Sequence, residues 1–296
     1  MSPATEAPFG GWRSPDIRWK PTHESLAETL DGGQSFRWHR GNGFFEGRWG
    51  AHVARLRATP AGIEYAVPRG TRGAATRRAL RHYLADDIDF ATLTDNLPWR
   101  SDAALATAMR AFPHLRILRQ PLPEALFCFL CSPTKRIPQI RELCETIALR
   151  HGTPLADGSK SLPDWNTLGA LGEAPLRAAG LGYRAGHIHK TAVFLAENPD
   201  WLNTVADAPT DAARDQLTRL PGVGGKIADC VLLFGAGRLE AFPVDTWVQR
   251  TLRKTYGLEG WTMPQLRQFA RAHFGDAAGY AQQYLFAAAR AGLIPS

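Results

Sequence analysis

The spacing of apolar residues changes near residue 100, and this change limits the folds open to the chain. Before it, GQSFRWHRGNGFFEGRW and HVARLRATPAGIEYAV alternate large apolar with polar residues around the turns HRGNGFF and TPAG. A helical run, RRALRHYLADDIDFATLTD, follows. From residue 101 on, apolar residues recur three or four positions apart between glycine and proline breakers. The sequence predicts an α+β protein with an antiparallel β-rich domain over residues 1–100 and an all-α domain over residues 101–296.

The composition is typical of a folded protein and is compatible with a polyanionic partner. Of the 296 residues, 44% are hydrophobic and 10% aromatic, enough to bury a sizeable core. Lysine and arginine number 35 against 28 acidic residues, a formal charge of +7. A basic surface suits a nucleic-acid partner, although net charge alone is a weak argument.

The cysteines and the N-terminus indicate an intracellular protein without a metal centre. The four cysteines are Cys128, Cys131, Cys144 and Cys230. The first two lie in the apolar run LFCFLCS, where buried packing is the expected role, and their spacing supplies neither a zinc site nor an iron–sulfur cluster. The start MSPATEAPFGGW lacks the pattern of a signal peptide, and no apolar stretch is long enough to span a bilayer. We expect no membrane association and a cytoplasmic location, at the nucleoid in a bacterium or in the nucleus of a eukaryote.

The stretch LPGVGGKIADC carries the strongest local signal in the chain. It is not a phosphate-binding P-loop, because Leu220 stands where a glycine is required and Ile227 follows Lys226 where serine or threonine is required. It is not a dinucleotide fingerprint either, because the preceding segment DAARDQLTRL is helical rather than a strand. What remains is a glycine turn between two helices, whose amides can hold a phosphate. A purely structural turn remains the alternative.

Lys226 lies in the first turn of the second helix. The positive end of a helix dipole favours a free amine over an ammonium, and only the free amine is a nucleophile. Cys230 follows four residues later, on the same helical face. The alternative is a solvated lysine above a buried cysteine.

An aspartate lies 19 residues beyond the lysine, in FPVDTWVQR. Asp245 precedes a helical pattern and is placed to cap it, which is its plain structural role. A carboxylate that faces a neutral lysine can also manage protons and stabilise developing positive charge.

The block LPGVGGKIADC followed by PVDTWV resembles the helix-hairpin-helix DNA glycosylases. Within them the chain is most similar to the 8-oxoguanine DNA glycosylase family, through GGQSFRW, LFCFLCS, LGLGYRAGHI, the hairpin block and AQQYLF in family order. The resemblance implies a TBP-like N-terminal domain and a helix-hairpin-helix catalytic domain with its hairpin near residues 219–226. It also implies a monomeric bifunctional glycosylase and AP lyase of base excision repair, acting on double-stranded DNA that contains 8-oxoguanine. No cofactor is implied, although hairpin carbonyls of this family can hold a monovalent cation.

The resemblance also implies roles for single residues in catalysis and base recognition. Lys226 would attack the deoxyribose C1′ and form a Schiff base that leads to β-elimination, and Asp245 would support departure of the base. The backbone carbonyl of Gly33 would detect the extra N7 hydrogen of 8-oxoguanine. Cys230, Phe286 and Gln282 would form the base pocket, the first two by sandwiching the base and Gln282 by bonding its Watson–Crick edge.

Further residues would contact the rest of the DNA. Tyr183 would wedge the duplex and Arg184 would contact the orphaned cytosine. Thr134 occupies the place of a gap-filling asparagine, and Gln139 falls where an arginine often contacts that cytosine, so these departures point to relaxed opposite-base selectivity. Contacts with the DNA backbone would come from the hairpin and from the helix start after Asp245, namely from Gly222, Gly224, Gly225, Thr246 and Trp247.

Two other functions compete with this interpretation. An alkylated-base glycosylase of the 3-methyladenine type would share the fold, but such enzymes work without the hairpin lysine. A non-catalytic DNA-binding module would share the hairpin, but it would leave Lys226, Cys230 and Asp245 without a common purpose.

Overall fold

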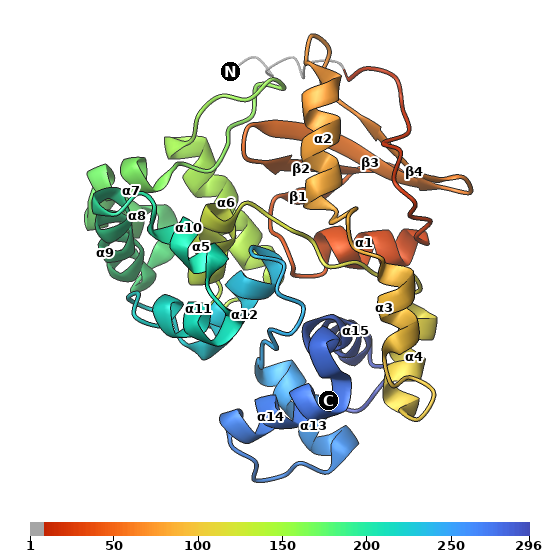
Figure 1. The fold of residues 1–296 in the computed structure, drawn as a ribbon. Helices are drawn as coiled ribbons and strands as arrows, with labels where there is room; N and C mark the ends of the chain where they lie inside the picture. The colour runs from red at the N-terminus through yellow and green to blue at the C-terminus, as the bar shows by residue number, and fades with distance from the viewer. Residues whose placement is uncertain (1–8) are drawn as a thin grey trace.

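The computed structural model describes residues 9–296, and its N-terminal part contains a four-stranded antiparallel sheet (Figure 1). The strands follow chain order and are β1 (Trp38–Arg40), β2 (Phe45–Trp49), β3 (His52–Thr59) and β4 (Gly62–Ala66). Both hairpin turns predicted from the sequence are confirmed. Residues 1–8 of the predicted N-terminal domain, including most of MSPATEAPFGGW, lie outside the described residues.

The sheet buries one face, as its two-residue alternation requires. Helices α1 (His23–Asp31) and α2 (Gly73–Tyr83) contribute to the core on that face. Trp38 stacks on Trp49 there at 5.8 Å between ring centroids, and its indole Nε1 donates to the Tyr83 hydroxyl at 3.0 Å. The other face carries ion pairs, such as that between Arg57 and Glu64.

Two helical details differ from the sequence pattern. Helix α1 was not predicted, yet Thr22 caps it by accepting from the Ser25 amide, and Leu26 and Leu30 bury its apolar side. The helical run after the sheet is two helices rather than one. It breaks because Asp89 accepts from two backbone amides and starts α3 (Phe90–Asn96).

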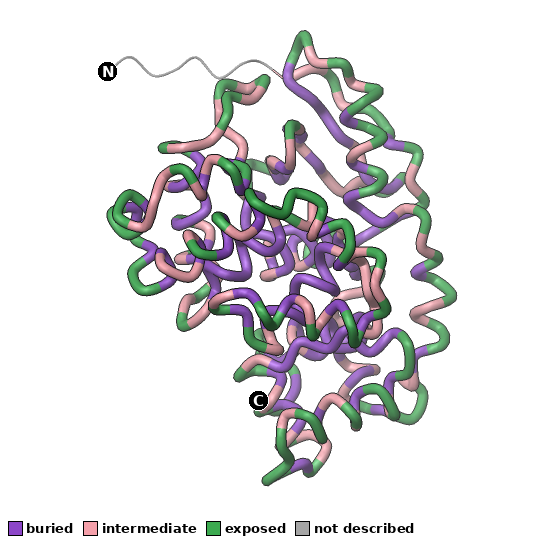
Figure 2. The backbone as a smooth tube through the Cα atoms, turned by 60° about the vertical axis from the view of Figure 1, so that its left-hand side comes forward, coloured by how far each residue is buried: buried purple, intermediate pink, exposed green. Residues whose placement is uncertain are grey.

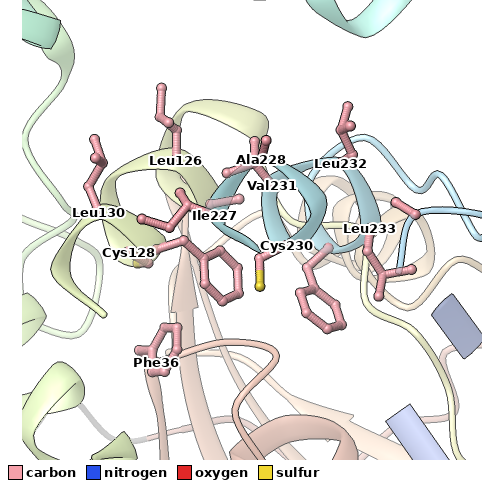
Figure 3. Close-up of a cluster of buried hydrophobic side chains, with 14 of the residues drawn as sticks. Phe36, Leu126, Cys128, Leu130, Ile227, Ala228, Cys230, Val231, Leu232 and Leu233 are labelled. Carbon is pink, nitrogen blue, oxygen red and sulfur yellow. The ribbon is translucent and has the colours of Figure 1, made fainter. Parts of the chain in front are cut away.

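The rest of the chain is helical, as the 3.6-residue periodicity predicts. Helices α5 (Leu122–Cys131) and α12 (Gly225–Phe234) pack together, and their apolar side chains form one cluster (Figure 3). In α12 every residue from Ile227 to Phe234 is buried, and Figure 2 shows buried backbone, in purple, running through the middle of the molecule. The elements are α4 (Ala103–Ala111), α5 (Leu122–Cys131), α6 (Ile137–His151), α7 (Trp165–Leu171), α8 (Glu173–Leu176), the π-helical η1 (Arg177–Leu181), α9 (Arg184–Glu197), α10 (Trp201–Asp207), α11 (Thr210–Leu217), α12 (Gly225–Phe234), α13 (Thr246–Tyr256), α14 (Met263–Phe274), the 3-10 turn η2 (Gly275–Ala277) and α15 (Ala278–Arg290).

The segment before the sheet is tied to the start of the helical part by one buried glutamine. The Gln34 side chain donates to the Arg116 carbonyl at 2.7 Å and accepts from the Leu118 amide at 2.9 Å. Its own carbonyl accepts from the Gln120 side chain at 2.7 Å. Because Gln34 is fully buried, these bonds fix the backbone next to Gly33. The domain boundary near residue 100 stays a prediction. Leu118 lies beyond this position in the chain but packs in the core under the sheet.

A substitution in β2 tests the packing of this sheet. A Cβ atom at Gly47 would lie 2.2 Å from the Trp38 indole, so Gly47→Ala should overpack the core and lower the free energy of unfolding by about 1–3 kcal/mol. Urea unfolding measures the change. Gly11→Ala is the matched control, because no atom lies within 4 Å of its Cβ position. Equal stability of the two variants would contradict the packing described here.

Candidate active site

The hairpin between α11 and α12 is the glycine turn predicted from LPGVGG. Gly222 has a φ of +80°, and a Cβ atom there would meet the His187 ring at 2.6 Å, so only glycine fits. Gly224 caps α12 and is exposed, as is Gly222, while Gly225 is partly covered. The amides that open α12 therefore lie at the surface, where an anionic oxygen can reach them.

Lys226 is the second residue of α12, as predicted. Its Nζ donates to the Ser132 hydroxyl at 3.4 Å and lies 5.5 Å from the centroid of the Phe129 ring. The side chain is half-buried. The amine is thus held between α5 and α12 while remaining partly accessible.

Cys230 lies one turn further along the same face and is only 4% exposed. Figure 3 shows its sulfur directed away from Ala228 and Val231, on the side where Phe36 lies. Burial raises the pKa of the Cys230 thiol to about 11, although Lys226 opposes the shift. The group is therefore a neutral thiol at neutral pH, which offers a flat apolar ligand a polarisable contact rather than a charge.

Asp245 caps α13, which confirms the structural part of its predicted role. Its Oδ1 accepts from the Val248 amide at 2.8 Å. Burial raises the pKa of the Asp245 carboxyl, while the Val248 amide and the charge of Lys226 act in the opposite direction. The carboxylate is consequently fixed by its own helix and lies within electrostatic reach of the amine.

A buried carboxylate of α12 anchors this helix to α11 and α14. Asp229 has no exposed side-chain surface, and its two oxygens accept from Arg214 of α11 at 2.6 Å and from Arg267 of α14 at 3.1 Å. Arg267 also covers the start of α12, because a Cβ atom at Gly225 would lie 2.4 Å from its guanidinium. This cluster of Asp229, Arg214 and Arg267 therefore holds α12 at Asp229, three residues after Lys226, and covers Gly225, the residue before it.

Gln282 and Phe286 lie one turn apart on α15. Gln282 is 4% exposed, and its side-chain oxygen has no hydrogen-bond partner among residues 9–296. A buried amide oxygen without a partner is costly, which fits a group that awaits a ligand. Gly33 has a φ of +112°, and its Cβ position would lie 3.7 Å from the Phe286 ring. An aromatic ring and a glycine backbone thus face each other.

The predicted wedge residues form a second cluster. Tyr183 is 53% exposed and lies edge-on to His187, which packs against the hairpin. Arg184 is only 4% exposed, and its guanidinium donates to the Thr134 hydroxyl at 2.8 Å and to the Pro133 carbonyl. Arg184 therefore supports the loop after α5, where Thr134 has a φ of +56°. Its direct contact with cytosine stays a prediction.

The remaining predicted DNA contacts lie at helix starts. The Gln139 side chain accepts from the Arg136 amide at 2.9 Å, so it caps α6. Thr246 and Trp247 are exposed in the first turn of α13. Gln139 is partly exposed, and the contacts of all three residues with DNA stay predictions.

The sequence analysis missed Ser132 and the cluster of Asp229, Arg214 and Arg267. Asp229 did leave a signal, because it is a charged residue in the apolar run that follows Lys226. Such a residue on a buried face needs ionic partners. Its partners, however, lie 15 and 38 positions away along the chain, and nothing in the local pattern identifies them.

Within residues 9–296, no group of three or more histidine, cysteine, aspartate or glutamate side chains is arranged to hold a metal ion. The four cysteines are unpaired and buried, as predicted for the first two. The described helices also include none that combines the length and hydropathy needed to cross a bilayer.

Comparisons with known proteins agree on one family. The family model described as "8-oxoguanine DNA glycosylase, N-terminal domain" matches residues 17–126. An N-glycosylase/DNA lyase from Arabidopsis thaliana is 31% identical over 293 residues, which cover 92% of this chain and 80% of that protein. An N-glycosylase/DNA lyase from Saccharomyces cerevisiae is 30% identical, over 78% of this chain and 68% of that protein.

A solved structure extends the likeness to the whole fold. The 8-oxoguanine glycosylase/lyase of Clostridium acetobutylicum, in complex with double-stranded DNA that contains cytosine opposite 8-oxoguanine, superimposes with a TM-score of 0.84. It is 27% identical, and the match covers 91% of this chain and 92% of that one. The predicted α+β architecture of a sheet domain followed by a helix-hairpin-helix domain is confirmed. The chain belongs to the 8-oxoguanine DNA glycosylase family.

Proposed function

We propose that the protein is a bifunctional DNA glycosylase and AP lyase of base excision repair that removes 8-oxoguanine from double-stranded DNA. One observation carries the proposal: a lysine amine opens the hairpin helix, within electrostatic reach of a capping carboxylate and one turn from a neutral buried thiol. Family membership and the names of the relatives support the same reaction.

The hairpin positions the DNA backbone in this proposal. The exposed amides around Gly222 and Gly224 bind a phosphate without reading sequence. The +7 net charge of the chain favours the approach of DNA. Since Lys226 follows the turn directly, the same grip brings a deoxyribose towards its amine.

The target base must leave the duplex before the amine can reach C1′. The neutral thiol of Cys230 and the ring of Phe286 offer two apolar surfaces for the extruded base. The unpartnered oxygen of Gln282 accepts from its Watson–Crick edge. The Gly33 carbonyl accepts the N7 hydrogen that 8-oxoguanine has and guanine lacks. The pocket thereby distinguishes the two bases by one hydrogen bond.

The reaction uses only groups of this chain and of the substrate. The Lys226 amine attacks C1′, a C1′–Nζ bond forms, and the bond between C1′ and the base breaks with its electrons leaving on the base. The base takes up a proton, and the attacking nitrogen loses one. The C1′–O4′ bond of the sugar ring then breaks, O4′ takes its electrons and a proton, and the C1′–Nζ bond becomes the double bond of a protonated Schiff base. Removal of a C2′ proton then breaks the C3′–oxygen bond. Asp245 stabilises the positive charge that develops at the sugar.

Tyr183 and the loop after α5 act on the opposite strand. Tyr183 is exposed and enters the stack beside the vacated position. Thr134 fills the gap and is held by a hydrogen bond from Arg184, which contacts the orphaned cytosine. Gln139 replaces a charged donor with a neutral amide that also caps a helix. We therefore include relaxed selectivity for the opposite base in the proposal.

An alkylated-base glycosylase is the second candidate on this scaffold. Such an enzyme would activate water with the aspartate and would need no amine at the hairpin. The contacts of Lys226 with Ser132 and Phe129 favour the lyase, because they hold the amine in place.

We propose that the enzyme acts as a monomer at the DNA, needs no cofactor, and binds at most a monovalent cation at the hairpin carbonyls. The compartment would be that of the genome, the bacterial nucleoid or the eukaryotic nucleus.

Substitution of the lysine tests the covalent step. Lys226→Gln should abolish the borohydride-trapped adduct with a duplex that contains 8-oxoguanine, because the amide cannot form a Schiff base. Lys190→Gln is the matched control, since Lys190 is exposed on α9, and it should trap as the native enzyme does. Base release without an adduct in the native enzyme would favour the alkylated-base candidate. An adduct in Lys226→Gln would refute the assigned nucleophile.

Substitution of the capping aspartate separates catalysis from folding. Asparagine is as good a helix cap as aspartate, so the free energy of unfolding of Asp245→Asn should lie within about 0.5 kcal/mol of the native value. It should keep its DNA affinity and lose about 100-fold or more in single-turnover excision, since the charge that stabilises the sugar is absent. Undiminished excision would remove Asp245 from the catalytic groups.

The anchoring role of the buried Asp229 carboxylate on α12 is tested by a pair of variants. Asp229→Asn leaves Arg214 and Arg267 without their shared anion and should lower the free energy of unfolding by about 3 kcal/mol. Cleavage at a preformed abasic site should slow as well, because the start of α12 loses its support. Asp211→Asn removes an exposed partner of the same Arg214 and should lower the free energy of unfolding by less than about 1 kcal/mol. Similar effects of both variants would contradict the anchoring role of Asp229.

A further inference from the structure

The residue before Gly33 is held by a charged pair that the catalytic scheme does not use. Arg290, the last residue of α15, donates to the Gly32 carbonyl at 2.5 Å. The same nitrogen lies 3.2 Å from the carboxylate of Glu28 in α1. The Glu28 side chain in turn folds over Gly32, since a Cβ atom there would lie 2.3 Å from its carboxylate oxygen. Gly32 is thus enclosed by Arg290 and Glu28.

Arg290 also contacts the aromatic wall of the proposed base pocket. Its guanidinium carbon lies 5.2 Å from the centroid of the Phe286 ring, one turn earlier on α15. A Cβ atom at Gly33 would lie 3.7 Å from the same ring and 2.9 Å from the Ile137 side chain, so Gly33 lies beside Phe286. One side chain therefore touches both the ring of Phe286 and the peptide that leads into Gly33.

Gly33 is consequently fixed from two directions. On its C-terminal side, the buried Gln34 is bonded to the segment from Arg116 to Gln120. On its N-terminal side, the Gly32 carbonyl accepts from Arg290 and the Gly32 amide donates to the Glu28 carbonyl. The position of the Gly33 carbonyl depends on the orientation of both neighbouring peptides, and the peptide of Gly32 is the one that Arg290 binds.

We propose that Arg290 and Glu28 are positioning residues that set the discrimination between 8-oxoguanine and guanine. They orient the Gly33 carbonyl and the Phe286 ring relative to each other. This inference rests on the proposed function, because it concerns the same base pocket. It predicts that loss of the pair weakens base discrimination while leaving the Lys226 chemistry intact.

The pair also responds to pH. Burial raises the pKa of Glu28 to about 7; Arg290 of α15 and Arg40 of β1 oppose the shift, and Asp31 of α1 adds to it. Asp31 is itself paired with Arg40 and with Arg141 of α6. As pH falls below about 7, Glu28 takes up a proton and its ion pair with Arg290 is lost, so discrimination should decline on the acid side.

The test compares two substrates in each variant. Single-turnover excision is measured on matched duplexes with 8-oxoguanine or guanine, and strand cleavage is measured on a duplex with a preformed abasic site. Arg290→Met removes the donor but keeps much of the bulk, and should lower the preference for 8-oxoguanine about tenfold, the effect of one lost hydrogen bond. Cleavage of the abasic site, which needs no base recognition, should stay within about twofold of the native rate, far below that loss.

Two further variants keep the test decisive if Arg290→Met folds poorly. Arg290→Lys retains a donor and a charge and should recover part of the preference. Glu28→Gln should make the preference for 8-oxoguanine over guanine independent of pH between about 6 and 8, the range in which the preference of the native enzyme changes. Arg100→Met, which removes an exposed arginine paired with Asp95, is the control and should change neither activity.

The outcomes separate the two proposals. A native protein that cleaves abasic sites but does not excise 8-oxoguanine would overturn both the proposed function and this inference. A native enzyme that prefers 8-oxoguanine, with the same preference in Arg290→Met and Glu28→Gln, would overturn the inference alone. Equal losses of base excision and abasic-site cleavage in Arg290→Met would also overturn it, since the residue would then be only structural.

Discussion

The shared ion pair of Asp229 with Arg214 and Arg267 is the interaction on which the site depends. It joins α12 to helices before and after it in the chain, and it does so three residues after Lys226. Removing a carboxylate from water is expensive, and two guanidinium partners offset that cost only while the helices keep their places. The glycine turn, the amine and the buried thiol therefore share one rigid support, so binding of the backbone and attack on the sugar are set by the same element.

The base pocket is assembled differently, from segments far apart in the chain. Gly33 precedes the sheet, Cys230 lies on α12, and Gln282 and Phe286 lie on the last helix. The contacts of Arg290 bring the first and last of these segments together, and buried hydrogen bonds of Gln34 tie the first to residues 116–120. Cys230 therefore shares the support of Lys226, whereas Gly33 and Phe286 are held by other contacts, so substitutions at Arg290 can be expected to affect base recognition separately from the nucleophile.

Local patterns predicted some of this and not the rest. The two hairpins, the turn before Lys226 and the cap at Asp245 are encoded within a few residues, and each is confirmed. The short helix α1 was missed, because only Leu26, Ala27 and Leu30 are its buried apolar residues, and three such residues leave little periodic signal. The partners of Asp229, the contacts of Arg290 and the burial of Arg184 are tertiary, so no spacing in one sequence reveals them. Arg184 shows the limit clearly, since its motif suggested a DNA contact and its side chain lies against Thr134.

The Lys226 amine, presented by an anchored hairpin helix, is the group that we propose forms the covalent bond. A crystal structure of the native enzyme trapped with borohydride on a duplex containing 8-oxoguanine tests this most directly. The account predicts continuous density from Lys226 Nζ to C1′ of the deoxyribose, a phosphate at the amides of the glycine turn, and an unshifted contact between Asp229 and both arginines. Density that joins C1′ to a different amine, or a hairpin that lies away from the DNA backbone, would contradict it.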